Sequence, residues 1–172
     1  MCGSVITVVL CWSVVNFNFY FFSFSTKYLA GGIFTDSLTL SSADIISCAS
    51  AGFFARAFGS KRSLFCSFLA AAIFAFVNAL FAHHGSWAIL GTLLLTRLGS
   101  TGGFIFAYLV TAEAFPPMYR SRIFSLCYVF GGVLCALAPV IAELIHFDPC
   151  FLLGCSASVG AVGTFGIKYY QA

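Results

Sequence analysis

Two ionisable side chains lie inside stretches of sequence that are otherwise mostly apolar. Asp44 lies several residues into the run 38–58, and Arg97 lies about ten residues into the run 87–114. A charge near the centre of a bilayer costs about 2.5 to 3.5 kcal/mol on insertion scales. Such groups are rare, and they mark functional sites unless they pair structurally or reach the membrane surface. Asp44 and Arg97 therefore predict either a polar site within a helix bundle or an ion pair that only stabilises it.

Aromatic and small polar residues recur near these charges at helical spacing. Residues three or four apart share one face of a helix, and this spacing places Thr101, Phe104 and Tyr108 on the face of Arg97. Further stripes join Trp12, Asn16 and Tyr20, and Tyr128, Gly132, Cys135 and Pro139. The face of Arg97 suits a solvated cavity better than lipid, although aromatic stripes in general are more often plain packing between helices than ligand contacts.

The composition limits the kind of protein that can carry these residues. Of 172 residues, 61% are hydrophobic and only 8% are charged, with a mean hydropathy of +1.03. An ordinary soluble domain has about 25% charged residues, so a soluble enzyme and a disordered chain are excluded. The eight Lys and Arg residues form no basic stripe, which excludes a nucleic-acid binder. The composition predicts a protein whose main partner is the lipid bilayer.

The hydrophobic runs predict a single all-α transmembrane domain covering residues 1–172. A spanning helix needs about 20 residues, and an alternating β-barrel pattern is missing. The eight cysteines form no C-x-x-C pair, and no Ser-His-Asp or paired-carboxylate arrangement occurs at helical spacing. We therefore expect no catalytic site, no metal and no cofactor. The predicted spans are approximately 2–26, 38–58, 64–81, 87–114, 123–141 and 151–167.

The distribution of basic residues predicts the orientation of these spans. Lys and Arg gather on the cytoplasmic side of membrane proteins. With six spans, Lys27 alone lies on the opposite face and Arg97 lies within a span. We expect an integral membrane protein with both termini in the cytoplasm. The basic residues predicted to share the cytoplasmic face are Arg56, Lys61, Arg62, Arg120, Arg122 and Lys168.

Two segments carry a resemblance to a known family. Residues 111–120, TAEAFPPMYR, resemble the T-A-E-x-[FY]-P-x-x-x-R signature after helix ten of major facilitator superfamily transporters, most closely the organic cation/anion/carnitine family. Residues 52–62, GFFARAFGSKR, resemble the superfamily loop G-x-x-x-D-R-x-G-R-R between helices eight and nine. Trp12, Asp44, Arg97 and Pro139 fall where that family places comparable residues in helices seven, eight, ten and eleven. The resemblance covers the chain as helices seven to twelve, one six-helix half of the bundle.

The resemblance implies a role for two sets of residues. The substrate cavity would be lined by Asp44, Arg97, Trp12, Tyr20, Phe104, Tyr108, Tyr128 and Gly132. The cytoplasmic gate would comprise Gly52, Arg56, Gly59, Lys61, Arg62, Glu113, Pro116 and Arg120.

Several positions depart from the family pattern. Arg56 replaces the acid of the loop, Ala57 the arginine after it, and Ser60 the first arginine of G-R-R. These changes should weaken the charge lock at the gate, or pair Arg56 with Glu113 instead. Gly132 replaces a residue whose charge distinguishes cation-type from anion-type members, so the sign of the substrate stays open.

The function implied is that of the C-terminal half of a secondary active or facilitative transporter, working by alternating access. Its substrates would be small organic cations, anions or zwitterions such as carnitine, and its location the plasma membrane. Half a cavity needs either a missing N-terminal six-helix half or a partner chain, and a homodimer of identical halves is also possible. The alternative is a truncated, non-transporting membrane protein that pairs with or regulates a full-length transporter.

Overall fold

The chain is helical in the part that the structure, a computed structural model, describes: residues 2–25, 33–81, 86–144 and 149–169. The helices are α1 (Cys2–Ser25), α2 (Ile33–Phe58), α3 (Ser60–Phe81), α4 (Ser86–Ala114), α5 (Pro117–Leu144) and α6 (Pro149–Phe165). No strand occurs among the described residues. The predicted all-α class is therefore confirmed.

Within the described residues, four helical segments are long and apolar enough to cross a membrane: Gly3–Phe24 of α1, Ser60–Leu80 of α3, Gly91–Ala114 of α4 and Pro117–Leu144 of α5. Helix α6 is apolar but has 17 residues, fewer than the roughly 20 of an ordinary span. Helix α2 has 26 residues but carries many hydroxyl groups and the charged Asp44 and Arg56. The chain is thus suited to a bilayer. That it crosses the bilayer six times stays a prediction.

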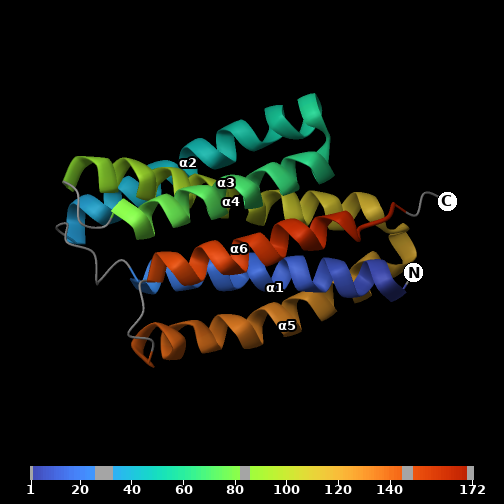
Figure 1. Cartoon of the computed structure of the whole chain (residues 1–172). Coiled ribbons are helices and arrows are strands. Elements are labelled where there is room, and N and C mark those ends of the chain that lie inside the picture. Colours follow the sequence, from blue (N-terminus) through green and yellow to red (C-terminus); the bar gives the residue numbers. More distant parts are fainter. Residues whose placement is uncertain (1, 26–32, 82–85, 145–148, 170–172) are drawn as a thin grey trace.

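Helix α4 is the element that links most of the bundle. It packs against α1, α2 and α3, while α6 fits between α1 and α3. Helix α5 packs mainly along α1, and α2 packs mainly along α4, so these two helices form opposite edges of the bundle (Figure 1). The α2–α3 and α4–α5 connections lie at the same end of the bundle as the start of α1 and the end of α6 (Figure 1).

Several helix boundaries differ from those expected for the spans. Helix α2 begins at Ile33 rather than 38 and so includes position 36. Helix α3 begins at Ser60, directly after Gly59, whose φ of 82° ends α2 in the left-handed conformation that glycine adopts easily. Helices α5 and α6 begin earlier than expected, at Pro117 and Pro149, since proline fits the first turn of a helix.

Small residues allow α3 and α4 to approach closely. A Cβ atom on Gly99 would lie 2.7 Å from the backbone nitrogen of Ala71. The buried Asn78 of α3 also donates to the Thr96 hydroxyl of α4 at 3.2 Å. Close backbone contact and interhelical hydrogen bonds hold helices together where no hydrophobic difference from lipid exists. The α3–α4 pair therefore forms a firm support for Arg97, one residue beyond Thr96.

Candidate functional site

Arg97 and Asp44 meet in a salt bridge between α4 and α2. Nε of Arg97 donates to Oδ1 of Asp44 and its Nη2 donates to Oδ2, each at 2.9 Å. This is the two-point geometry in which guanidinium and carboxylate bind most strongly. The Arg97 side chain is 5% exposed, whereas that of Asp44 is 30% exposed. The guanidinium of the pair is therefore buried, whereas the carboxylate is accessible from outside the bundle.

Helix α1 supplies the remaining partners of the guanidinium. Nη1 of Arg97 donates to the carbonyl of Phe19 at 3.1 Å and to the Ser23 hydroxyl at 3.0 Å. The Phe19 ring also lies 4.0 Å from the guanidinium carbon, within the range of a cation–π contact. Thr101, one turn after Arg97, donates its hydroxyl to Oδ1 of Asp44 at 2.5 Å. Three helices thus neutralise and orient both charges.

A cluster of aromatic side chains lies further along α1, α4 and α5. The indole of Trp12 donates to the Thr111 hydroxyl at 2.8 Å and is 1% exposed. Tyr108 covers it edge-on with ring centroids 4.4 Å apart, and Tyr128 lies at 5.3 Å. The two tyrosine hydroxyls are hydrogen-bonded to each other. Trp12 is therefore an internal support, and the tyrosines form the accessible surface above it.

The other predicted cavity residues occupy different depths. Tyr20 is 39% exposed and Tyr128 is 55% exposed. Phe104 is half-buried and joins the two groups, because its ring packs against both Phe19 and Trp12. Gly132 is exposed, and a Cβ atom there would meet nothing within 4 Å. The structure thus joins the ion pair and the aromatic cluster through Phe104 and Phe19 into one continuous site.

The predicted gate contains a hydrogen bond where the family pattern predicts an ionic lock. The buried hydroxyl of Ser60, at the start of α3, donates to Glu113 Oε1 at 2.8 Å. Arg56 is exposed and makes no ion pair with Glu113, so the expected re-pairing of these two residues is wrong. The physical reason is position: Ser60 follows the Gly59 turn and faces the end of α4. An uncharged donor therefore holds the only acid of the predicted gate.

The other residues of the predicted gate have separate roles. Lys61 donates its ammonium to the Ile167 carbonyl at 2.6 Å, just beyond the end of α6, where the helix dipole favours a cation. Burial and the negative charge of Glu113 raise the pKa of Tyr169 above its ordinary value. Pro116 lies in the break between α4 and α5, and Nε of the half-buried Arg120 has no hydrogen-bond partner. Gly52 and Arg62 are exposed.

Several contact residues of the site were not predicted from the sequence. Phe19 and Ser23 contact Arg97, Phe124 packs on Trp12 at 5.8 Å, and Ser60 binds Glu113. Phe19 and Ser23 are four residues apart in an apolar helix and therefore share one of its faces, and the single hydroxyl of Ser23 is the only sequence signal that could have indicated this face. The sequence does not indicate which helix packs against Phe19 and Ser23.

Comparison of the chain with models of known protein families and with curated proteins finds no match. Membership of the transporter family therefore stays a prediction that depends on the two motif segments. Among the residues that the structure describes, no three His, Cys, Asp or Glu side chains gather in a way that could hold a metal ion. The site presents a salt bridge, hydroxyl groups and aromatic rings.

Proposed function

We propose that the chain is one six-helix half of a membrane transporter for small organic ions, working by alternating access. The observation that carries this proposal is the Arg97–Asp44 pair, which lies within otherwise apolar helices and has a partly exposed carboxylate. A purely structural pair could be replaced by apolar residues with little loss. The presence of two costly charges in a membrane domain therefore favours a site that exchanges partners.

The surroundings favour an organic ligand over a bare inorganic ion. Tyr20 and Tyr128 are exposed, and ring contacts through Phe19, Phe104 and Trp12 connect them to the ion pair. Aromatic faces attract organic cations by about 0.5 to 2 kcal/mol each. An ammonium group could compete with Arg97 for the Asp44 carboxylate, and a carboxylate could compete with Asp44 for Arg97. Zwitterions such as carnitine match both halves of the pair.

The test is uptake by cells that express the chain together with the N-terminal half of an organic cation transporter. Labelled tetraethylammonium, carnitine and para-aminohippurate probe the three possible charge classes. Uptake per molecule of surface protein should fall at least tenfold in Asp44→Asn and recover in part in Asp44→Glu. Equal uptake per molecule in the wild type and Asp44→Asn, or no uptake of any probe by the wild type, would refute the proposal.

A non-transporting partner of a full-length transporter is the second candidate. It is favoured by the hydrogen-bonding of Arg97, whose Nε, Nη1 and Nη2 all have acceptors within the bundle. It is favoured too by the uncharged Ser60 on Glu113, which leaves the predicted gate without an internal ion pair. The same experiment distinguishes the two. A regulator would co-purify with an intact transporter and change its uptake, and Asp44→Asn would leave that effect unchanged.

A further inference from the structure

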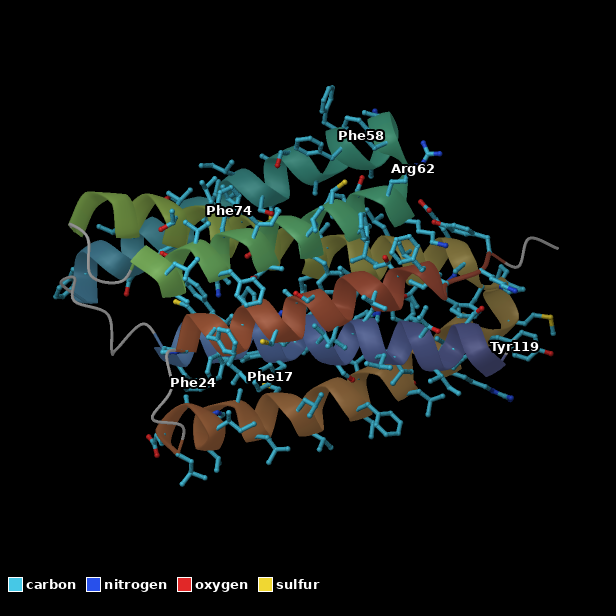
Figure 2. All side chains as sticks on the ribbon, in the orientation of Figure 1. Phe17, Phe24, Phe58, Arg62, Phe74 and Tyr119 are labelled. Carbon is cyan, nitrogen blue, oxygen red and sulfur yellow. The ribbon has the colours of Figure 1, made fainter. Side chains whose placement is uncertain are left out.

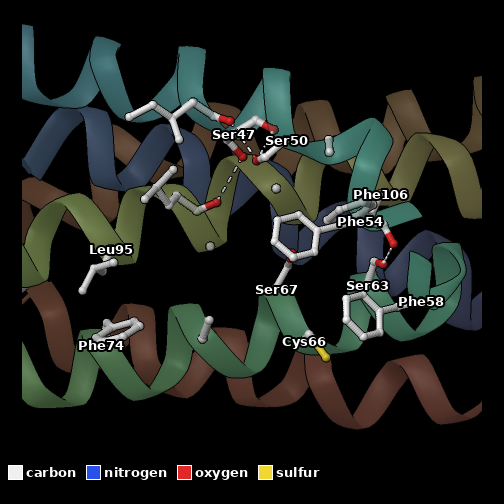
Figure 3. Close-up of a pocket in the computed structure, with 16 residues that line it drawn as sticks. Ser47, Ser50, Phe54, Phe58, Ser63, Cys66, Ser67, Phe74, Leu95 and Phe106 are labelled. Atoms are coloured by element: carbon white, nitrogen blue, oxygen red, sulfur yellow. Dashed lines mark hydrogen bonds between the residues drawn. The ribbon is translucent and has the colours of Figure 1, made fainter. Parts of the chain in front are cut away.

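A large groove lies between α2, α3 and α4, separate from the ion pair and the aromatic cluster. Its volume is about 500 Å³, compared with the roughly 150 Å³ of an apolar cavity that takes up benzene. It runs lengthwise along the helices, from Phe74 and Leu95 at one end to Phe58 and Ser63 at the other (Figure 3). The shape and size suit an extended hydrocarbon chain.

Of the four serines that line the groove, all but Ser67 donate their hydroxyls to backbone carbonyls of the protein. The Ser47 hydroxyl donates to the Leu98 carbonyl, the Ser50 hydroxyl to Ile46 and the Ser63 hydroxyl to Phe54. Because these donors are satisfied within the protein, water in the groove would find few partners. Apolar rings and small side chains form most of the rest of the wall. Hydrocarbon is therefore the favoured filling.

The groove is open to the surroundings of the bundle. Phe54, Phe58 and Leu95 line it and are themselves 44%, 57% and 38% exposed. Cys66, on the same wall, is also exposed. In a membrane-embedded chain, exposed apolar side chains that no partner covers face lipid. The groove can thus be entered sideways by an acyl chain.

One end of the groove meets an exposed basic residue, Arg62. Phe58 and Arg62 lie together at the end of the bundle where α2 turns into α3 (Figure 2). Arg62 is exposed and lies one helical turn before the groove-lining Cys66, so both lie on one face of α3. The neighbouring Lys61 is engaged with Ile167. A cation at the mouth of an apolar groove complements an anionic headgroup.

We propose that this groove binds one acyl chain of an anionic membrane phospholipid, with the headgroup against Arg62. The basic end of the bundle is the one that the distribution of Lys and Arg predicts to be cytoplasmic, and the cytoplasmic leaflet holds the anionic lipids. Burial of the acyl chain in the apolar groove provides the binding energy, and Arg62 makes an anionic headgroup preferred over a neutral one. The site is independent of whether the chain transports a solute.

The experiment measures lipid retention by native mass spectrometry of the purified chain in micelles. Phosphatidylserine and phosphatidylcholine of identical acyl chains are added in equal amounts. Ala70→Phe places a ring in the groove, and Ala136→Phe on the exposed face of α5 is its control. Arg62→Gln removes the cation, and Arg122→Gln, exposed in the first turns of α5, is its control.

The wild type should retain one phosphatidylserine in preference to phosphatidylcholine. Arg62→Gln should lower that preference about fivefold, the effect of about one basic residue at a membrane surface, while Arg122→Gln leaves it unchanged. Ala70→Phe should lose both lipids and Ala136→Phe neither. Equal retention in Ala70→Phe and Ala136→Phe, or an unchanged preference in Arg62→Gln, would overturn the proposal. Arg62→Gln alters only an exposed side chain, so it decides the question even if Ala70→Phe fails to fold.

Discussion

Removing the carboxylate of Asp44 should destabilise the bundle more than removing the guanidinium of Arg97. Asp44→Asn leaves a cation that is 5% exposed without its counter-ion. The Phe19 carbonyl and the Ser23 hydroxyl still accept from it. Breaking a buried pair costs about 3 to 5 kcal/mol, and with these remaining acceptors we expect about 3 kcal/mol, the lower end of that range.

The reverse substitution leaves a better solvated charge. Arg97→Gln leaves the Asp44 carboxylate 30% exposed and still bound by the Thr101 hydroxyl. We expect a cost of about 2 kcal/mol, between the values for buried and for surface pairs. The double variant removes both charges at once, so its cost should fall short of the sum of the single costs by about 2 kcal/mol.

The assay is the free energy of unfolding of the chain in dodecyl maltoside micelles, titrated with dodecyl sulfate and followed by circular dichroism. Cys48→Ala, an exposed change one turn after Asp44, is the matched control and should stay within about 0.5 kcal/mol of the wild type. Single costs that add to within about 0.5 kcal/mol of the double would refute the reasoning. In that event the pair would carry no coupling energy.

The same variants separate a structural pair from a binding site. A ligand that binds only the folded chain raises its apparent stability as its concentration rises. Tetraethylammonium should therefore stabilise the wild type, and the effect should be lost in Asp44→Asn if the carboxylate is the binding group. Stabilisation of equal size in both would assign the ligand to another part of the chain.

Three further substitutions test the packing. Gly99→Ala should lower the free energy of unfolding by about 1 to 3 kcal/mol, because the added methyl group forces α3 and α4 apart. The control Gly91→Ala, in the same helix, places its methyl group in open space and should be neutral or stabilising. The same unfolding titration measures both. Gly59→Ala should cost about 1 to 2 kcal/mol because of the left-handed backbone there, with Gly59→Asn costing less; equal costs would contradict this. Ser60→Ala should cost about 1 kcal/mol of unfolding free energy through its lost bond to Glu113, and that bond should contribute nothing further in a chain that already carries Glu113→Ala, which has no acceptor at this position.

The helices were largely predictable from the sequence. When only 8% of the residues are charged and the apolar runs are long, helices are the stable structure that these runs can form in lipid. Gly59 and the prolines at 116 and 117 marked two of the connections. The starts of the helices were less predictable, since residues such as Asp36 and Arg62 fit either a polar connection or the end of a helix.

The candidate site was predictable only as a set of residues. Asp44 and Arg97 were marked by the cost of placing charge among apolar side chains. Their pairing across 53 positions of the chain, and the choice of Ser60 over Arg56 as the donor to Glu113, depended on contacts between distant segments. The groove beside Ser47 and Phe58 has no signature in the sequence at all.

The sequence by itself determined that this chain is helical, suited to lipid, and equipped with one acid and one base inside apolar helices. Only the tertiary structure decided which helix faces meet, that α1 supplies acceptors to Arg97, and that a groove remains open between α2 and α3. The physical reason is that these helices are apolar on nearly every side. Hydrophobic periodicity then no longer separates the inner face from the outer one, and shape and hydrogen bonding decide the packing.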